Sequence, residues 1–217
     1  MDLNIFVYVL LIFCIPYLLY SNIRIRPRKG FSVLFISIIS TVILLNFSLV
    51  TIVGTFFLIL TLMIKSKNSH PYLYGVSFLL LNYEIFNLLN LNIFEFVIDY
   101  LFPISLVSGV FSSMMIGHWF LVDPTISKEG MKKIAITSTY QSLILAPLVF
   151  FDFIGQDIES ILKNVILILF LSTSILSFAS YKSLGEKSYT GVMASTGLSY
   201  LSLIVSLGAS GGLLLLS

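Results

Sequence analysis

The chain has few charged residues, a single cysteine and two histidines, and these shortages exclude several classes of protein. Only 10% of its 217 residues are charged, whereas 58% are hydrophobic. The lone Cys14 excludes a disulfide within the chain, and one thiol with two distant histidines does not make a zinc site. The sequence also lacks a serine nucleophile motif and a glycine-rich phosphate loop. It therefore carries no catalytic signature.

Apolar segments of membrane-spanning length are abundant. A hydrocarbon core of about 30 Å needs roughly 20 apolar residues per helix, so the chain has room for about eight such helices and no soluble domain. We predict an all-α integral membrane protein that forms a single transmembrane helical domain over residues 1–217. The predicted spans are 4–20, 31–46, 48–64, 71–90, 97–122, 134–154, 164–181 and 189–216.

Two of these spans depend on weak local signals. Residues 31–64 are too many for one helix, and Asn46, Phe47 and Ser48 offer a tight turn that divides them. Near the N-terminus, only Asp2 precedes the first apolar run, whereas a cleavable signal peptide has basic residues there. We therefore expect two spans within 31–64 and a retained first helix.

The basic residues are distributed unevenly along the chain. Eleven of the 12 Lys and Arg fall in four short loops, which a chain of eight spans places on one side of the membrane. Basic loops remain in the cytoplasm, so both termini are predicted on the outer side, and the bacterial inner membrane is the expected location. One loop is also a candidate site for anionic lipid headgroups. Its basic residues are Arg24, Arg26, Arg28 and Lys29.

The predicted outer side is acidic. Its acids are Asp2, Glu95, Asp99, Asp152, Asp157 and Glu159, against the single base Lys163. Such a surface attracts a basic soluble protein by electrostatic steering. We expect membrane lipids and other membrane subunits as partners, this basic protein as a further one, and no nucleic acid.

Small residues recur at helical spacing in two predicted spans. The first face consists of Ser105, Gly109, Ser113 and Gly117, and the second of Gly191, Ser195, Ser199, Gly208 and Gly212. Residues at this spacing share one face of a helix, and small side chains there let another backbone approach closely. Two interpretations stay open, namely packing within this chain and docking of a different subunit.

An ionisable residue lies inside the fourth predicted span. Glu84 shares a polar stripe with Tyr83 and Asn87, and a charge at that depth is costly unless it is paired or protonated. No basic residue lies at matching depth, so we expect an amide, a hydroxyl, water or a group on another protein as its partner. Asn87 and Gln141 are the candidate amides. The alternatives are a proton or cation relay and a satisfied, protonated side chain.

The two histidines lie near the cytoplasmic ends of adjacent predicted spans. His70 begins the fourth span and His118 ends the fifth, and two axial histidines on neighbouring helices are what a b-type haem needs. The run that contains His118, Trp119, Asp123 and Pro124 has two further interpretations. It anchors the helix at the membrane interface, where Trp is common, or it contacts a partner.

Three functional hypotheses follow. The first is a non-catalytic subunit of a larger membrane complex, most plausibly respiratory or otherwise energy-transducing, because the chain has no domain outside the bilayer. The second is a small transporter or proton-coupled channel that uses Glu84, Asn87 and Gln141. The third is a membrane enzyme that acts on a lipid or quinone with His118 as the acid–base group. It is the weakest of the three, because no carboxylate lies within a helical turn of His118.

Overall fold

The chain folds into helices throughout the residues that the structure describes. The computed structural model describes residues 3–25, 29–63, 70–90, 92–124, 127–186 and 188–216, without the side chains of residues 19–32 and 62–71. The helices are α1 (Leu3–Ile25), α2 (Lys29–Leu45), α3 (Leu49–Met63), α4 (His70–Leu89), α5 (Ile93–Glu95), the π-helical turn η1 (Phe96–Leu101), α6 (Phe102–Val122), α7 (Glu129–Phe150), α8 (Ser160–Ser183) and α9 (Tyr189–Leu216).

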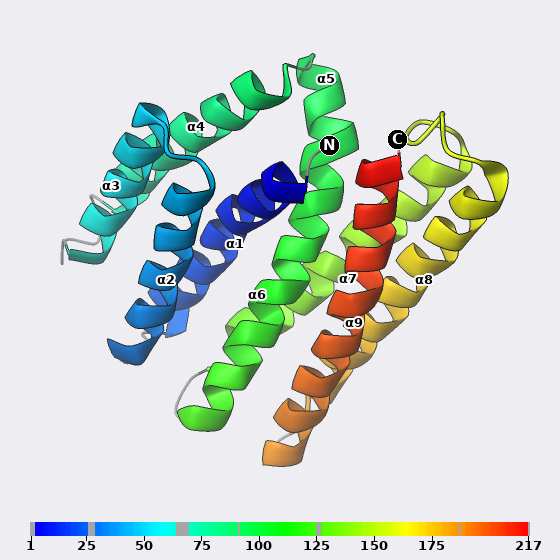
Figure 1. The fold of residues 1–217 in the computed structure, drawn as a ribbon. Coiled ribbons are helices and arrows are strands. Elements are labelled where there is room, and N and C mark those ends of the chain that lie inside the picture. The colour runs from blue at the N-terminus through cyan, green and yellow to red at the C-terminus, as the bar shows by residue number, and fades with distance from the viewer. Residues whose placement is uncertain are drawn as a thin grey trace.

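The C-terminal half is a bundle of long helices. Neighbours α6 and α7, α7 and α8, and α8 and α9 pack against one another, and α9 closes the bundle against α6 (Figure 1). Within the described residues, four continuous helical segments are long and apolar enough to cross a membrane, which supports a membrane location. These segments are Ile93–Val122, Glu129–Phe150, Ser160–Ser183 and Tyr189–Leu216.

The N-terminal half is a layer of shorter helices. Helices α2 and α3 form a hairpin, and α4 packs along α3. Helix α1 lies between this layer and the bundle, because it contacts α3 and α4 through Tyr8 and Phe13 and contacts α6 through Ser108. Its side chains fill the main apolar core, together with Phe35, Leu81 and Ile104. This helix therefore decides which polar groups of the two halves can meet.

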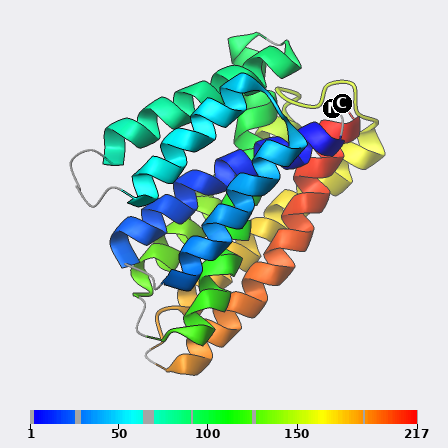
Figure 2. The same ribbon diagram turned by 60° about the vertical axis from the view of Figure 1, so that its left-hand side comes forward.

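The helices follow the predicted segments closely. The break predicted at Asn46–Ser48 is present, since α2 ends at Leu45 and α3 begins at Leu49. The first and last described helical residues of the chain lie near each other at one end of the molecule, as Figure 2 shows. Helices α2 and α3 have 17 and 15 residues, and such short helices reach about 25 and 22 Å at 1.5 Å per residue. Within the described residues, a length and composition sufficient to span a membrane are established for four segments.

Candidate functional site

Glu84 lies in a polar network between α4, the α2–α3 turn and α1. Its carboxylate accepts a hydrogen bond from the Asn46 side-chain amide at 3.1 Å. The same amide nitrogen lies 3.4 Å from the hydroxyl of Thr51, which bonds the buried Tyr8 hydroxyl at 2.8 Å. Among the described residues, the half-buried carboxylate thus has an amide partner and no basic one, and that partner is neither Asn87 nor Gln141.

The short α2–α3 turn positions this network. Asn46 follows the last residue of α2, and Ser48 precedes α3 and accepts a hydrogen bond from the Thr51 backbone N–H at 3.1 Å, as an N-capping serine does. The turn thereby presents the Asn46 amide at the start of α3. The rest of the predicted stripe does not join the network, because Tyr83 and Asn87 are exposed on α4.

Gln141 belongs to a second polar cluster, on the other side of α1. Its amide nitrogen donates to Ser105 of α6 at 3.2 Å and to Tyr17 of α1 at 3.3 Å. Tyr17 is nine residues from Tyr8, which corresponds to half a rotation of a helix, so the two hydroxyls point to opposite sides of α1. The predicted grouping of Glu84 with Gln141 in one site is therefore not what the structure shows. The reason is that α1 separates them.

The small-residue face of α6 packs against neighbouring helices of the same chain. A Cβ atom on Gly117 would lie 2.5 Å from the Thr196 hydroxyl of α9, and one on Gly109 would lie 3.1 Å from the Ser138 hydroxyl of α7. Both glycines are buried. This face is therefore occupied within the chain, so it offers no docking surface for a separate subunit.

The face of α9 follows the prediction over its first half only. Ser195 and Ser199 bond the Ser180 hydroxyl of α8 at 2.7 and 3.3 Å, and a Cβ atom on Gly191 would lie 2.5 Å from the Ser183 carbonyl oxygen. Gly208 is exposed and Gly212 is half-buried, so Gly208 does not share the buried face of Ser195 and Ser199. It lies nine residues beyond Ser199 and so half a rotation away. Instead, the buried face continues through Ser202, Ser206 and Ser210.

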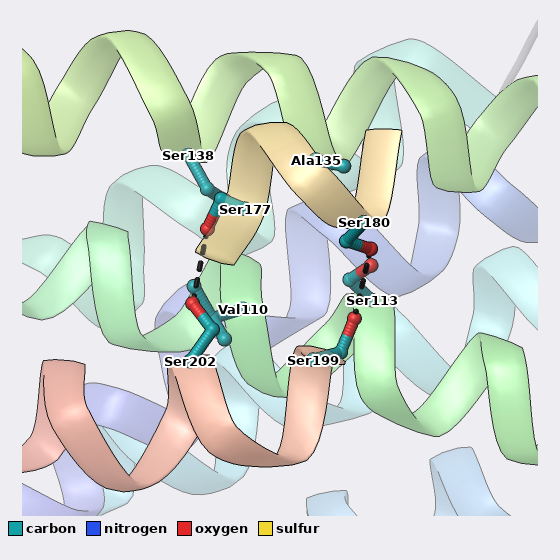
Figure 3. A pocket seen from close by; sticks show the side chains of 8 residues that line it. All are labelled: Val110, Ser113, Ala135, Ser138, Ser177, Ser180, Ser199 and Ser202. Atoms are coloured by element: carbon teal, nitrogen blue, oxygen red, sulfur yellow. Dashed lines mark hydrogen bonds between the residues drawn. The ribbon is translucent and has the colours of Figure 1, made fainter. Parts of the chain in front are cut away.

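These faces enclose a small cavity between α6, α7, α8 and α9 (Figure 3). About 10 Å³ of it is open to the centre of a water-sized molecule. The lining residues are Val110, Ser113, Ala135, Ser138, Ser177, Ser180, Ser199 and Ser202. None of them is ionisable, so the cavity offers hydroxyl groups alone.

Two of the cavity's hydroxyls lack a protein partner. Ser177 bonds Ser202 at 3.0 Å, and Ser180 bonds Ser199, as the dashed lines in Figure 3 show. The hydroxyls of Ser113 and Ser138 have no hydrogen-bond partner, although their residues are only 3% and 1% exposed. Buried polar groups are paired in the large majority of cases, so two unpaired ones at one cavity call for an explanation.

The Gln141 cluster lies close to the cavity. Gly109 lies between them, since a Cβ atom placed there would be 3.1 Å from both the Ser138 hydroxyl and the Tyr17 ring. Hydroxyl and amide groups thus follow one another through the bundle interior, from Tyr17 through Ser138 to Ser180. Apart from Tyr17, the members of this series come from α6, α7, α8 and α9.

The two histidines are on helices with different neighbours. Helix α4, which His70 begins, packs mainly on α3, whereas α6 packs on α1, α7 and α9. The His70 side chain lies outside the described ones, and His118 is exposed. This packing does not favour one haem iron shared by both. In the described part of the chain, no group of three or more His, Cys, Asp or Glu is placed to hold a metal.

The remaining predicted sites lie at the helix ends. After His118, Trp119 is half-buried, Asp123 is buried and Pro124 is exposed, so this run is partly packed into the protein. The proposed headgroup loop falls outside the described part of the structure. Arg26 and Arg28 are not described, and the side chains of Arg24 and Lys29 are not described either.

Comparison with known proteins gives no relative for this chain. No family model matches it, and neither a curated protein nor a solved structure shows significant similarity to it. Any functional inference therefore rests on the sites themselves.

Sequence reasoning missed the most informative residues. Tyr17 is a single polar residue in an apolar run, and no local pattern singles it out. Asn46 was predicted as part of a turn, but no local pattern pointed to it as the partner of Glu84. The serines of α8 had a usable signal, because Ser174, Ser177 and Ser180 recur every three residues and so lie along one side of a helix. Extending the search for small-residue faces to serines at this spacing would have found half of the cavity.

Proposed function

We propose that the chain is an integral membrane protein of the bacterial inner membrane that crosses the bilayer eight times, with both termini outside. The distribution of basic residues supports this topology. The alternating directions of the helices support it too, because α6 and α8 end away from the chain termini (Figure 1). The short α2 and α3 span the bilayer in this proposal by local thinning, as short helices can at modest cost.

We further propose that the bundle α6–α9 conducts a small polar species. The observation that carries this proposal is the pair of unpaired hydroxyls, Ser113 and Ser138, facing a hydroxyl-lined cavity. Leaving a buried hydroxyl unsatisfied costs about 1–3 kcal/mol, and an alanine at either position would avoid that cost. Polar groups retained inside a membrane protein commonly mark the path of a substrate. In this proposal the conducting residues are these serines and not Glu84, because α1 separates Glu84 from the bundle.

Flux measurements on the purified protein in liposomes test this function. We expect protein-dependent permeation of water, urea or glycerol, measured by stopped-flow light scattering. Ser138→Val should lower that flux at least about tenfold, because it removes the hydroxyl and fills the space beside it at a cost above about 1.4 kcal/mol in the barrier. The matched control is Thr137→Val, on the exposed side of the same helix. Wild-type liposomes no more permeable than empty ones would exclude conduction of these species.

A subunit of a larger, energy-transducing membrane complex is the second candidate. The observation that favours it is the exposed polar face of α4, where Tyr83 is 58% exposed and Asn87 is also exposed. Polar side chains exposed at membrane depth favour cover by another protein. Native mass in mild detergent, with identification of co-purifying proteins, tests this candidate. A defined large assembly would support it, whereas a lone 24.3 kDa species would exclude it.

A further inference from the structure

We propose that the cavity in the α6–α9 bundle is a binding site for an uncharged hydrogen-bonding molecule, occupied by water at rest. This inference deepens the proposed conduction by naming the chemical class of its ligand. It rests on three properties of the cavity: its unpaired hydroxyls, its size and its lack of charge. Each of them restricts the ligand independently.

The unpaired hydroxyls require a ligand that forms hydrogen bonds. Ser113 on α6 and Ser138 on α7 are at least 97% buried, and neither hydroxyl has a partner in the protein. The other four serines of the cavity bond one another, so they do not satisfy Ser113 and Ser138. A water molecule can donate to and accept from both of these hydroxyls. An apolar ligand would leave both hydroxyls unsatisfied.

The size of the cavity restricts the ligand to a very small one. About 10 Å³ is open to the centre of a water-sized molecule, which is near the minimum that holds one water. Alanine at 135 helps to keep this space open, because it lines the cavity with a side chain of a single carbon. A larger solute would need the helices to separate.

The lack of charge excludes an ion as the resting ligand. The lining consists of six serines, one valine and one alanine. An ion in the membrane interior needs an opposite charge or many oriented dipoles, and these few hydroxyls already bond largely to one another. A neutral molecule carries no such penalty. The same property makes a passage through this point selective for uncharged species.

Water-edited solid-state NMR of the full chain in liposomes tests the site. With serine labelled by carbon-13, proton magnetisation transferred from water should reach the Cβ atoms of Ser113 and Ser138. Two serines act as references: Ser127 lies exposed before α7, and Ser108 is buried on α6, donates a hydrogen bond to the Leu10 carbonyl oxygen and does not line the cavity. We expect transfer at Ser113 and Ser138 close to that at Ser127 and well above that at Ser108. Transfer no greater than at Ser108 would show a dry cavity and overturn the proposal.

A substitution adds a second measurement. Ser138→Val should fill the cavity and lower the water transfer at Ser113, whereas unchanged transfer would place the water elsewhere and overturn the site. If this variant does not fold, the wild-type spectrum still decides. The experiment detects water and not flux. If the cavity is hydrated but the protein shows no flux, the binding site is supported and the proposed conduction is excluded.

Discussion

The two halves of this protein bury different kinds of side chain. Helix α1 and the layer α2–α4 enclose an interior of large apolar residues, among them Phe35, Ile39, Leu58 and Leu81, each at most 2% exposed. The bundle α6–α9 has an interior rich in small hydroxyl residues. Its buried serines are Ser108, Ser112, Ser113, Ser138, Ser142, Ser174, Ser177, Ser180, Ser195, Ser199, Ser202, Ser206 and Ser210.

This difference shows two ways of packing helices in one chain. In the bundle, small residues let backbones approach closely and hydroxyls bond across the interfaces. In the other half, large apolar side chains fill the interior and the polar network of Glu84 gathers at a turn. A substitution that prevents close approach of two backbones should therefore lower stability more in the bundle than in the layer. Four substitutions test this contrast, in order of decreasing effect.

Gly117→Val should have the largest effect. Its Cβ would lie 2.5 Å from the Thr196 hydroxyl and 2.9 Å from Met131, so the variant should lose about 3 kcal/mol or more of stability by overpacking. In the layer, a Cβ on Gly54 would lie 3.0 Å from Cγ and Cδ2 of Leu81, which is a longer contact, so Gly54→Ala should cost less. Thermal unfolding in detergent measures both. The control Gly197→Val faces open space, and equal melting temperatures for it and Gly117→Val would refute the close approach.

Gln141→Leu should have the next largest effect. It removes the hydrogen bonds to Tyr17 and Ser105 at the centre of the molecule and should destabilise the fold by about 1–3 kcal/mol, because those hydroxyls have lost a partner. The neighbouring Tyr140→Phe, on a residue 61% exposed, is the control and should change little. Thermal melting of both variants checks this, and a neutral Gln141→Leu would show that the cluster contributes no stability.

Glu84→Leu should cost less, about 1 kcal/mol, by removing the acceptor for the Asn46 amide. The loss is limited because Glu84 is half-exposed, so other polar groups can replace part of it. Glu84→Gln keeps a carbonyl acceptor and should lie between the wild type and Glu84→Leu. Chemical unfolding of the three proteins gives the order. A Glu84→Gln variant as unstable as Glu84→Leu would show that the negative charge itself is needed.

Lys163→Gln should have the smallest effect. It removes the ion pair with Asp152, whose side chain is 62% exposed, and such pairs contribute about 0–1 kcal/mol. Any difference from the wild type should disappear in about 1 M salt, where the screening length falls to about 3 Å. Melting curves at low and high salt measure it. A salt-independent loss would mean that Lys163 acts through packing instead.

Local patterns predicted the helices better than they predicted contacts. The turn at Asn46–Ser48 and the close-packed glycines 109, 117 and 191 follow from composition and spacing along one helix. The partner of Glu84 does not, because Asn46 is 38 residues away and several amides were equally eligible. Gly208 lies off the buried face for a geometric reason, since nine residues beyond Ser199 correspond to half a rotation of the helix.

Residue types and their spacing are enough to predict that this chain is helical and apolar, where its helices break and which of their faces are small. These properties depend on residue type and on spacing within one segment, and lipid or water acts on each segment separately. In contrast, it is the packing of the helices that brings Tyr17 to Gln141 across 124 positions and that puts α1 between Glu84 and the bundle. It also decided that serines from four helices meet at one cavity. Such encounters depend on how each helix is rotated against its neighbours, and that rotation is set by the packing of all the helices together.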